Sequence, residues 1–297
     1  MTSGRLSGIW SAVLTPVDAD LAPDASRAIR CYGDLLQAGC DGLNVLGTTG
    51  EAMSVSADQR AAFMEALASS GLPMAQMMVG TGAASLGDTR RLTRLAFECG
   101  FTAALVMPPF FFRDASHDGI LAFFDALFAR MDPPPKSVLL YNFPRMSGIT
   151  FDLPLVDRLL EAFPELIAGM KDSSNVARLQ SAVIERHPAM AVFPGSESDL
   201  LAAKRRGVAG CISGSVALWP QLARGVFTRG DANEAEELRA RRSALEGFAF
   251  IPAVRYLMAG LRGDPAWERP LPPVLPLGPQ ERLALKCAVE PFGMHFR

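Results

Sequence analysis

The chain has 297 residues and a formal net charge of -2. Such a small charge gives no general attraction to nucleic acid or to an anionic membrane, so neither is expected as a partner and local groups must bind any anionic ligand. With 49% hydrophobic and 20% charged residues, the composition predicts a compact globular protein with a large core.

Neither export nor a membrane-spanning segment is expected from the sequence. Residues 1–17 lack the charged and apolar regions of a signal peptide, and the apolar stretch 103–112 (AALVMPPFFF) is short and broken by Pro108 and Pro109. The five cysteines are an odd number and include no CxxC pair. We therefore expect reduced thiols and a cytoplasmic location.

Short apolar runs that end in small or polar residues recur along the chain. They predict strands over 9–15, 42–47, 74–80, 102–107, 137–143, 166–171, 191–195 and 210–214. Between them, apolar residues recur three and four positions apart and predict helices, for example over 57–70, 88–99, 117–130 and 198–206. Ser56 and Gln59 form a candidate capping box before the first of these helices.

Strands that are apolar on both faces and alternate with helices predict an α/β fold. Eight such repeats fit a (β/α)8 TIM barrel, whereas a doubly wound open sheet would usually carry a glycine-rich turn after its first strand, which 14–20 (LTPVDAD) lacks. Further helical stretches are predicted at 231–247, 252–262 and 279–290, with a proline-rich loop over 264–279. We expect a barrel catalytic core over 1–218, and over 219–297 the last barrel helix with a C-terminal helical extension.

Lys171 directly follows the apolar segment 166–170 (LIAGM), at the predicted carboxyl end of a strand, where the active sites of barrels lie. Only four of the 29 basic residues are lysines, so a lysine in an apolar segment requires its own reason. In a largely apolar barrel mouth the ammonium loses solvation, and a free amine can attack a ketone to form a Schiff base. The alternative is a solvated strand end.

Other predicted strand ends carry hydroxyl groups. Tyr141 could move protons during Schiff-base formation, while Thr48 and Thr49, in GTTGE at 47–51, offer hydroxyl and backbone N–H donors to a carboxylate. Taken singly, the tyrosine could cap a core and GTTGE could be an ordinary turn. Because these residues end the second, fifth and sixth predicted strands, their combination favours an active site.

The same motifs resemble a known family. GTTGE at 47–51, YNFP…SG at 141–148 and GMKDSS at 169–174 have the order and spacing found in the dihydrodipicolinate synthase and N-acetylneuraminate lyase superfamily of class I pyruvate aldolases. The resemblance runs from 8 through 215 and less distinctly into the tail.

The resemblance implies a role for each matching residue. Lys171 would be the Schiff-base lysine, Tyr141 the proton-relay residue, and Thr48 and Thr49 its partners and the ligands of the pyruvate carboxylate. The backbone at Ile212 would line the pyruvate site, and the protein would be a homotetramer built from dimers.

The chain departs from the lysine-pathway synthases of this family at two places. Those enzymes carry an arginine five residues after the catalytic tyrosine, where this chain has Met146. They also lend a tyrosine across the dimer interface after the fourth strand, where this chain has Phe110 and Phe111. Both departures make aspartate semialdehyde a poorer substrate and favour an aldolase or lyase acting on a 2-keto-3-deoxy sugar acid or a 4-hydroxy-2-oxo acid.

Residues at the remaining strand ends are candidates for binding the second substrate. Gly195 ends the seventh predicted strand and is placed in the substrate site. Ser173, Glu197 and Ser213 are candidate contacts for the hydroxyl groups of the aldehyde.

No metal or cofactor is expected, because a protonated imine is itself an electron sink and because the histidines show no zinc-type spacing. Three alternatives remain open: a true 4-hydroxy-tetrahydrodipicolinate synthase that condenses pyruvate with aspartate semialdehyde, a non-catalytic keto-acid-binding sensor, and a phosphate-binding barrel. The last lacks a basic residue next to Gly195 and Gly214, the glycines at the ends of its seventh and eighth predicted strands.

Overall fold

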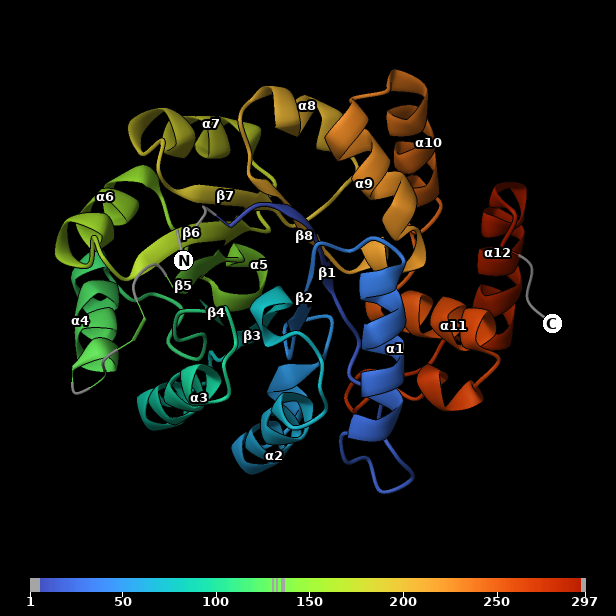
Figure 1. Cartoon of the computed structure of the whole chain (residues 1–297), viewed down its shortest axis with the longest axis horizontal. Helices are drawn as coiled ribbons and strands as arrows, with labels where there is room; N and C mark the ends of the chain where they lie inside the picture. Colours follow the sequence, from blue (N-terminus) through green and yellow to red (C-terminus); the bar gives the residue numbers. More distant parts are fainter. Residues whose placement is uncertain (1–5, 130, 132, 135–136, 295–297) are drawn as a thin grey trace.

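The computed structural model describes residues 6–129, 131, 133–134 and 137–294. Within this part of the chain, eight parallel strands form the centre of the molecule (Figure 1). They are β1 (Gly8–Ala12), β2 (Gly42–Val45), β3 (Met77–Gly80), β4 (Ala103–Val106), β5 (Val138–Asn142), β6 (Ile167–Asp172), β7 (Ala191–Pro194) and β8 (Gly210–Ser213).

The strands curve into a nearly closed barrel. From β1 to β7 each strand pairs with the next one in chain order, and β8 pairs with β1. The N–H of Ala209, directly before β8, donates to the carbonyl of Val192 in β7 at 2.9 Å and links the two ends of the sheet. The predicted TIM barrel is thus confirmed.

Helices connect the strands and surround them (Figure 1). They are α1 (Ala25–Gln37), α2 (Ala57–Ala68), α3 (Leu86–Glu98), α4 (His117–Phe128), α6 (Leu153–Ala162), α7 (Ala177–Arg186), α8 (Leu200–Arg205) and α9 (Pro220–Arg229). A short helix, α5 (Pro144–Ser147), directly follows β5.

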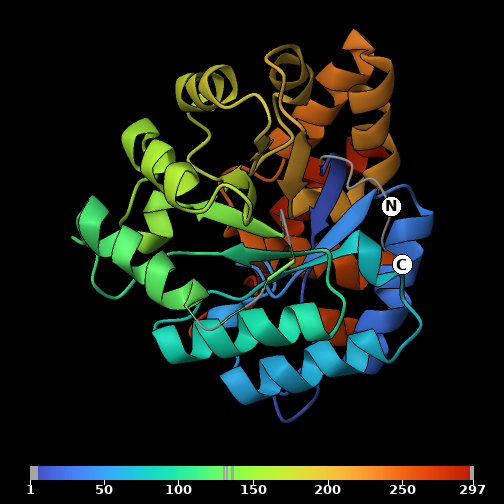
Figure 2. The same cartoon turned by 60° about the vertical axis from the view of Figure 1, so that its left-hand side comes forward.

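Three further helices form the predicted C-terminal extension: α10 (Ala232–Ser243), α11 (Phe250–Arg262) and α12 (Pro279–Val289). In Figure 1 they lie on one side of the barrel, next to α9 and α1, and Figure 2 shows them from another direction. Arg262 of α11 donates to the carbonyl of Cys31 in α1 at 3.2 Å, so the extension is bonded to the start of the barrel.

Local sequence signals set several element boundaries. Before α2, the predicted capping box is confirmed: the N–H of Gln59 donates to Ser56 Oγ and the N–H of Ser56 donates to Gln59 Oε1, each at 3.2 Å. The third strand was predicted from 74, but Met74–Gln76 forms a 3-10 turn after Pro73, so β3 begins at Met77.

Other boundaries also differ from the prediction by a few residues, among them the end of the stretch predicted over 231–247, which is Ser243. β1 ends at Ala12 rather than at 15: the N–H of Val13 still donates to the carbonyl of Asn44 at 3.1 Å, and beyond it the chain turns back to form a bridge between Val17 and Pro23. The helix predicted over 117–130 ends at Phe128, and position 130 itself lies outside the described residues.

The core is divided by the barrel wall. One apolar cluster fills the interior and includes Trp10, Met78, Leu105, Leu139 and Phe193. Two larger clusters fill the space between the strands and the helices. Because alternate strand residues face these two layers, the strands are apolar on both faces, which is the pattern that predicted a parallel sheet.

The five cysteines are free thiols. Burial raises the pKa of Cys31 to about 11 and that of Cys40 to about 12, so neither thiol ionises at neutral pH.

Over the described residues, no helix is long and apolar enough to cross a membrane.

Candidate active site

The three predicted catalytic residues meet at the carboxyl ends of their strands. Tyr141 of β5 and Lys171 of β6 are direct neighbours in the strand register, and Lys171 Nζ lies 4.6 Å from the centre of the Tyr141 ring. Both side chains are nearly buried, with 4% of Lys171 and 3% of Tyr141 exposed. Thr48 Oγ1 lies 3.1 Å from Tyr141 Oη, within hydrogen-bonding distance.

This arrangement joins an amine to a short chain of hydroxyl groups. The Tyr141 hydroxyl can give a proton to a group bound at Lys171 and regain one from Thr48, because each hydroxyl is both a donor and an acceptor. Burial shields the Lys171 side chain from bulk water, so a carbonyl compound bound beside it would meet little competition from solvent.

The turn that carries Thr48 and Thr49 has an unusual backbone. Leu46 and Glu51, on either side of Gly47–Gly50, have φ angles of 50° and 52°, in the left-handed region that residues other than glycine seldom occupy. The N–H of Glu51 closes the turn by donating to the carbonyl of Thr48 at 3.0 Å. Such a conformation costs free energy and persists only where surrounding contacts hold it.

A buried ion pair supplies those contacts from the C-terminal extension. Arg255 of α11 donates from Nε to Glu51 Oε2 at 2.6 Å, and both side chains are fully buried. Arg255 also donates to the carbonyls of Thr15 at 2.8 Å and Trp267 at 3.2 Å, while the N–H of Leu271 donates to Glu51 Oε1 at 2.8 Å.

Sequence reasoning missed Arg255. Burial lowers its guanidinium pKa, although the neighbouring Glu51 carboxylate acts in the opposite direction. The available signal was the glutamate of GTTGE, because a carboxylate predicted beside a buried turn requires a cationic partner.

A second buried network holds the ends of β5 and β6 together. Asp172 accepts hydrogen bonds from Asn142 Nδ2 at 2.8 Å, Ser174 Oγ at 2.6 Å and Gln180 Nε2 at 2.8 Å. Asn142 and Asp172 directly follow Tyr141 and Lys171, so this pair fixes the separation of the two catalytic strands.

The end of β3 is held by Arg60 of α2. Its guanidinium donates to the carbonyls of Gly80 at 2.7 Å and Gly82 at 3.0 Å. Burial lowers the pKa of Arg60 to about 10, which still leaves it protonated at neutral pH.

The residues predicted to bind the substrates separate into two groups. Ser173 and Gly195 lie side by side, because a Cβ atom added to Gly195 would be only 2.3 Å from Ser173 Oγ. Ile212 belongs to the interior cluster with Tyr141. A Cβ atom at Gly214, just beyond β8, would lie 2.8 Å from Thr49 Oγ1, so Thr49 rests against this end of the barrel.

Glu197 and Ser213 belong to a different cluster. Ser213 follows Ile212 in β8 and so faces the opposite side of the barrel wall. Its Oγ lies 3.4 Å from Ser215 Oγ, which donates to Glu197 Oε1 at 2.5 Å, and Trp219 Nε1 donates to the same oxygen at 3.3 Å. Glu197 and Ser213 are both buried.

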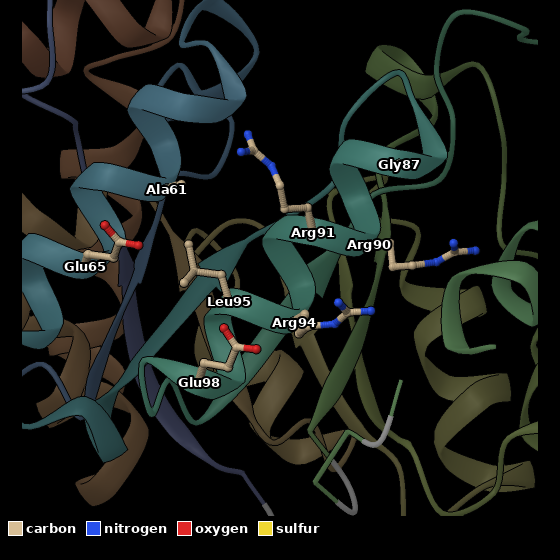
Figure 3. A pocket seen from close by; sticks show the side chains of 8 residues that line it. All are labelled: Ala61, Glu65, Gly87, Arg90, Arg91, Arg94, Leu95 and Glu98. Carbon is tan, nitrogen blue, oxygen red and sulfur yellow. The ribbon is translucent and has the colours of Figure 1, made fainter. Parts of the chain in front are cut away.

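A separate hollow of about 460 Å³ lies on the outer surface between α2 and α3 (Figure 3). It is lined by Ala61, Glu65, Gly87, Arg90, Arg91, Arg94, Leu95 and Glu98. In Figure 3, Arg90 and Arg94 extend away from Glu65. None of the predicted site residues lines this hollow, so it is distinct from the candidate active site.

Comparison with known proteins agrees with this geometry. The model of the dihydrodipicolinate synthetase family matches residues 5–291. An uncharacterized DapA-like lyase of Chloroflexus aurantiacus is 34% identical over 95% of this chain and 96% of its own, and an N-acetylneuraminate lyase of Rhizobium meliloti is 30% identical over 88% of each.

Among solved structures, dihydrodipicolinate synthase from Agrobacterium tumefaciens superposes with a TM-score of 0.90 at 28% identity, covering 96% of this chain and 98% of that one. The family model also covers the helices that follow the barrel, since it continues to residue 291. The chain therefore belongs to the dihydrodipicolinate synthetase family and is a carbon–carbon lyase, as its motifs predicted.

Proposed function

We propose that this protein is a Schiff-base-forming class I aldolase that makes or cleaves the bond between pyruvate and an aldehyde. In the cleavage direction its substrate would be a 2-keto-3-deoxy sugar acid or a 4-hydroxy-2-oxo acid, which is also the product of bond formation. The observation that carries this proposal is the burial of Lys171 beside Tyr141, whose hydroxyl is paired with Thr48.

Each residue then has a defined role. The Lys171 amine attacks C2 of the keto acid, and the carbonyl oxygen leaves as water after Tyr141 has delivered a proton. Thr48 and Thr49 hold the pyruvate carboxylate through hydroxyl and backbone N–H donors. The protonated imine accepts the electron pair of the C3–C4 bond when that bond breaks, or supplies it through the enamine when the bond forms.

Borohydride trapping tests this proposal directly. Reduction in the presence of pyruvate should convert the imine into a stable carboxyethyl-lysine, and peptide mapping should place it on Lys171. A folded sample without this adduct would contradict the proposed chemistry, whereas an adduct in a protein that turns over no aldehyde would support the keto-acid sensor.

Removing the Tyr141 hydroxyl should separate binding from proton transfer. We expect Tyr141→Phe to lower kcat by about 10²- to 10⁴-fold, because the proton relay is lost while the ring remains to pack against Lys171. Thr48→Val, which leaves the Tyr141 hydroxyl without its partner, should produce a smaller loss in kcat. Steady-state kinetics would measure both, and an unchanged kcat in Tyr141→Phe would exclude the relay role.

The synthase reaction is the second candidate, because the Agrobacterium structure bears that name. Against it, Met146 occupies the position of the expected arginine and is 46% exposed on α5. Turnover of pyruvate with aspartate semialdehyde, followed by formation of the cyclic product, would distinguish the synthase from the aldolase.

We further propose a cytoplasmic homotetramer. The free thiols fit a reducing compartment, and the tetramer follows from the family resemblance. Light scattering of the purified protein would report its mass.

A further inference from the structure

One wall of the barrel mouth is aromatic. Phe110, in the loop after β4, and Phe143, directly after β5, pack against the interior cluster that contains Met107 and Tyr141. The rings of Tyr141 and Phe143 are 5.8 Å apart between centroids. The apolar surface therefore begins at the catalytic tyrosine and continues outward.

The rim next to this wall is apolar as well. Phe111 and Phe112 are 77% and 71% exposed, with their rings in an edge-to-face contact at 5.4 Å. Met146, on the neighbouring α5, is also exposed. Exposed apolar rings in this segment fit the subunit interface of the homotetramer proposed above, so the binding of the aldehyde is argued from the inner rings of Phe110 and Phe143 alone.

Two of the three polar side chains predicted to bind a sugar chain lie elsewhere. The buried cluster around Ser215 and Trp219 binds Glu197, and Ser213 lies on the outer side of the barrel wall. Of the three candidate hydroxyl contacts, Ser173 alone lies with Gly195 at the ends of β6 and β7. A polyhydroxylated aldehyde would leave hydroxyl groups unpaired against the aromatic wall, which costs free energy.

From this distribution we infer that the aldehyde partner carries an apolar substituent, with Phe110 and Phe143 as specificity-determining residues. This inference rests on the proposed function and narrows its substrate class to 4-hydroxy-2-oxo acids that are apolar beyond C4. In the forming direction, the pyruvate imine loses a C3 proton and C3 attacks the aldehyde carbon. The aldehyde oxygen gains a proton, and water then hydrolyses the imine to release product and free Lys171.

The test compares benzaldehyde with glyceraldehyde and succinate semialdehyde, each with saturating pyruvate. The wild type should show a kcat/KM for benzaldehyde at least about tenfold above that for either polar aldehyde. Because aldehydes differ in intrinsic reactivity, the sharper readout is the selectivity ratio, which is kcat/KM for benzaldehyde divided by kcat/KM for glyceraldehyde or succinate semialdehyde. Phe110→Ser and Phe143→Ser should each lower this ratio by about tenfold or more relative to the wild type.

Phe97→Ser provides a matched control, because Phe97 is also partly buried but packs in the outer core on α3. Its ratio should equal that of the wild type. If Phe110→Ser does not fold, Phe110→Leu, which keeps an apolar side chain of smaller area, should lower the ratio by a smaller factor.

The outcomes separate this inference from the proposed function. A pyruvate adduct on Lys171 together with a preference for glyceraldehyde or succinate semialdehyde would overturn the inference and leave the aldolase proposal standing. An unchanged ratio in both serine variants would also overturn it. Absence of the adduct would overturn the proposed function itself.

Discussion

Replacing Lys171 with methionine should lower turnover of pyruvate with any aldehyde by about 10⁴-fold or more, the scale of loss seen when a covalent nucleophile is removed. Methionine keeps an unbranched apolar stem next to the Tyr141 ring but has no amine, so packing is largely preserved and imine formation is not. The measurement is kcat with saturating pyruvate, combined with borohydride trapping and intact mass.

Lys204→Met is the control for this prediction. Lys204 lies at the surface on α8, where it donates to the carbonyl of Thr228 at 3.2 Å, and its loss should leave kcat unchanged. A Lys171→Met protein that is folded by circular dichroism and retains more than a small fraction of turnover would show that another group performs the chemistry.

Replacing Arg255 with methionine should lower the free energy of unfolding by about 3–5 kcal/mol. The substitution leaves the Glu51 carboxylate buried without its charged partner and removes a donor from the carbonyls of Thr15 and Trp267. Because Glu51 follows the turn that carries Thr48, we also expect kcat to fall in the fraction that remains folded. Chemical denaturation monitored by circular dichroism would measure the stability.

Two further variants isolate the ion pair. Arg262→Met, on the same helix, breaks a pair with the exposed Asp34 and should cost no more than about 1 kcal/mol. Combining Glu51→Gln with Arg255→Met removes the unpaired charge and should recover part of the lost stability. If Arg255→Met were no more destabilising than Arg262→Met, the buried pair would not be the support of the turn.

The barrel was predictable because its strands are apolar on both faces and recur at regular intervals. The position of Lys171 and Tyr141 at the barrel mouth could be predicted for a related reason, since a polar residue that ends such a strand must lie there. The start of β3 was misplaced because Pro73 nucleates a turn within an otherwise apolar run.

Contacts between segments far apart in the chain could not be predicted from the sequence. Glu51 and Arg255 are 204 positions apart, and no local periodicity records such a pairing. The side of the barrel wall that Ser213 faces follows from the alternation of side chains along a strand, but only once the ends of β8 are known. Glu197 lies beyond the end of β7, where side chains no longer alternate between the two faces of a strand.

The turn that carries Thr48 and Thr49 ends at the left-handed Glu51, which is held by hydrogen bonds from residues more than 200 positions further along the chain. A shortened protein that ended after α9 would still contain every strand and every proposed catalytic side chain. It would nevertheless lack both donors that reach Glu51, and the turn would be free to relax toward ordinary backbone angles. The smallest working unit is therefore larger than the eight repeats, and transplanting the GTTGE motif into another barrel would require transplanting its distant support as well.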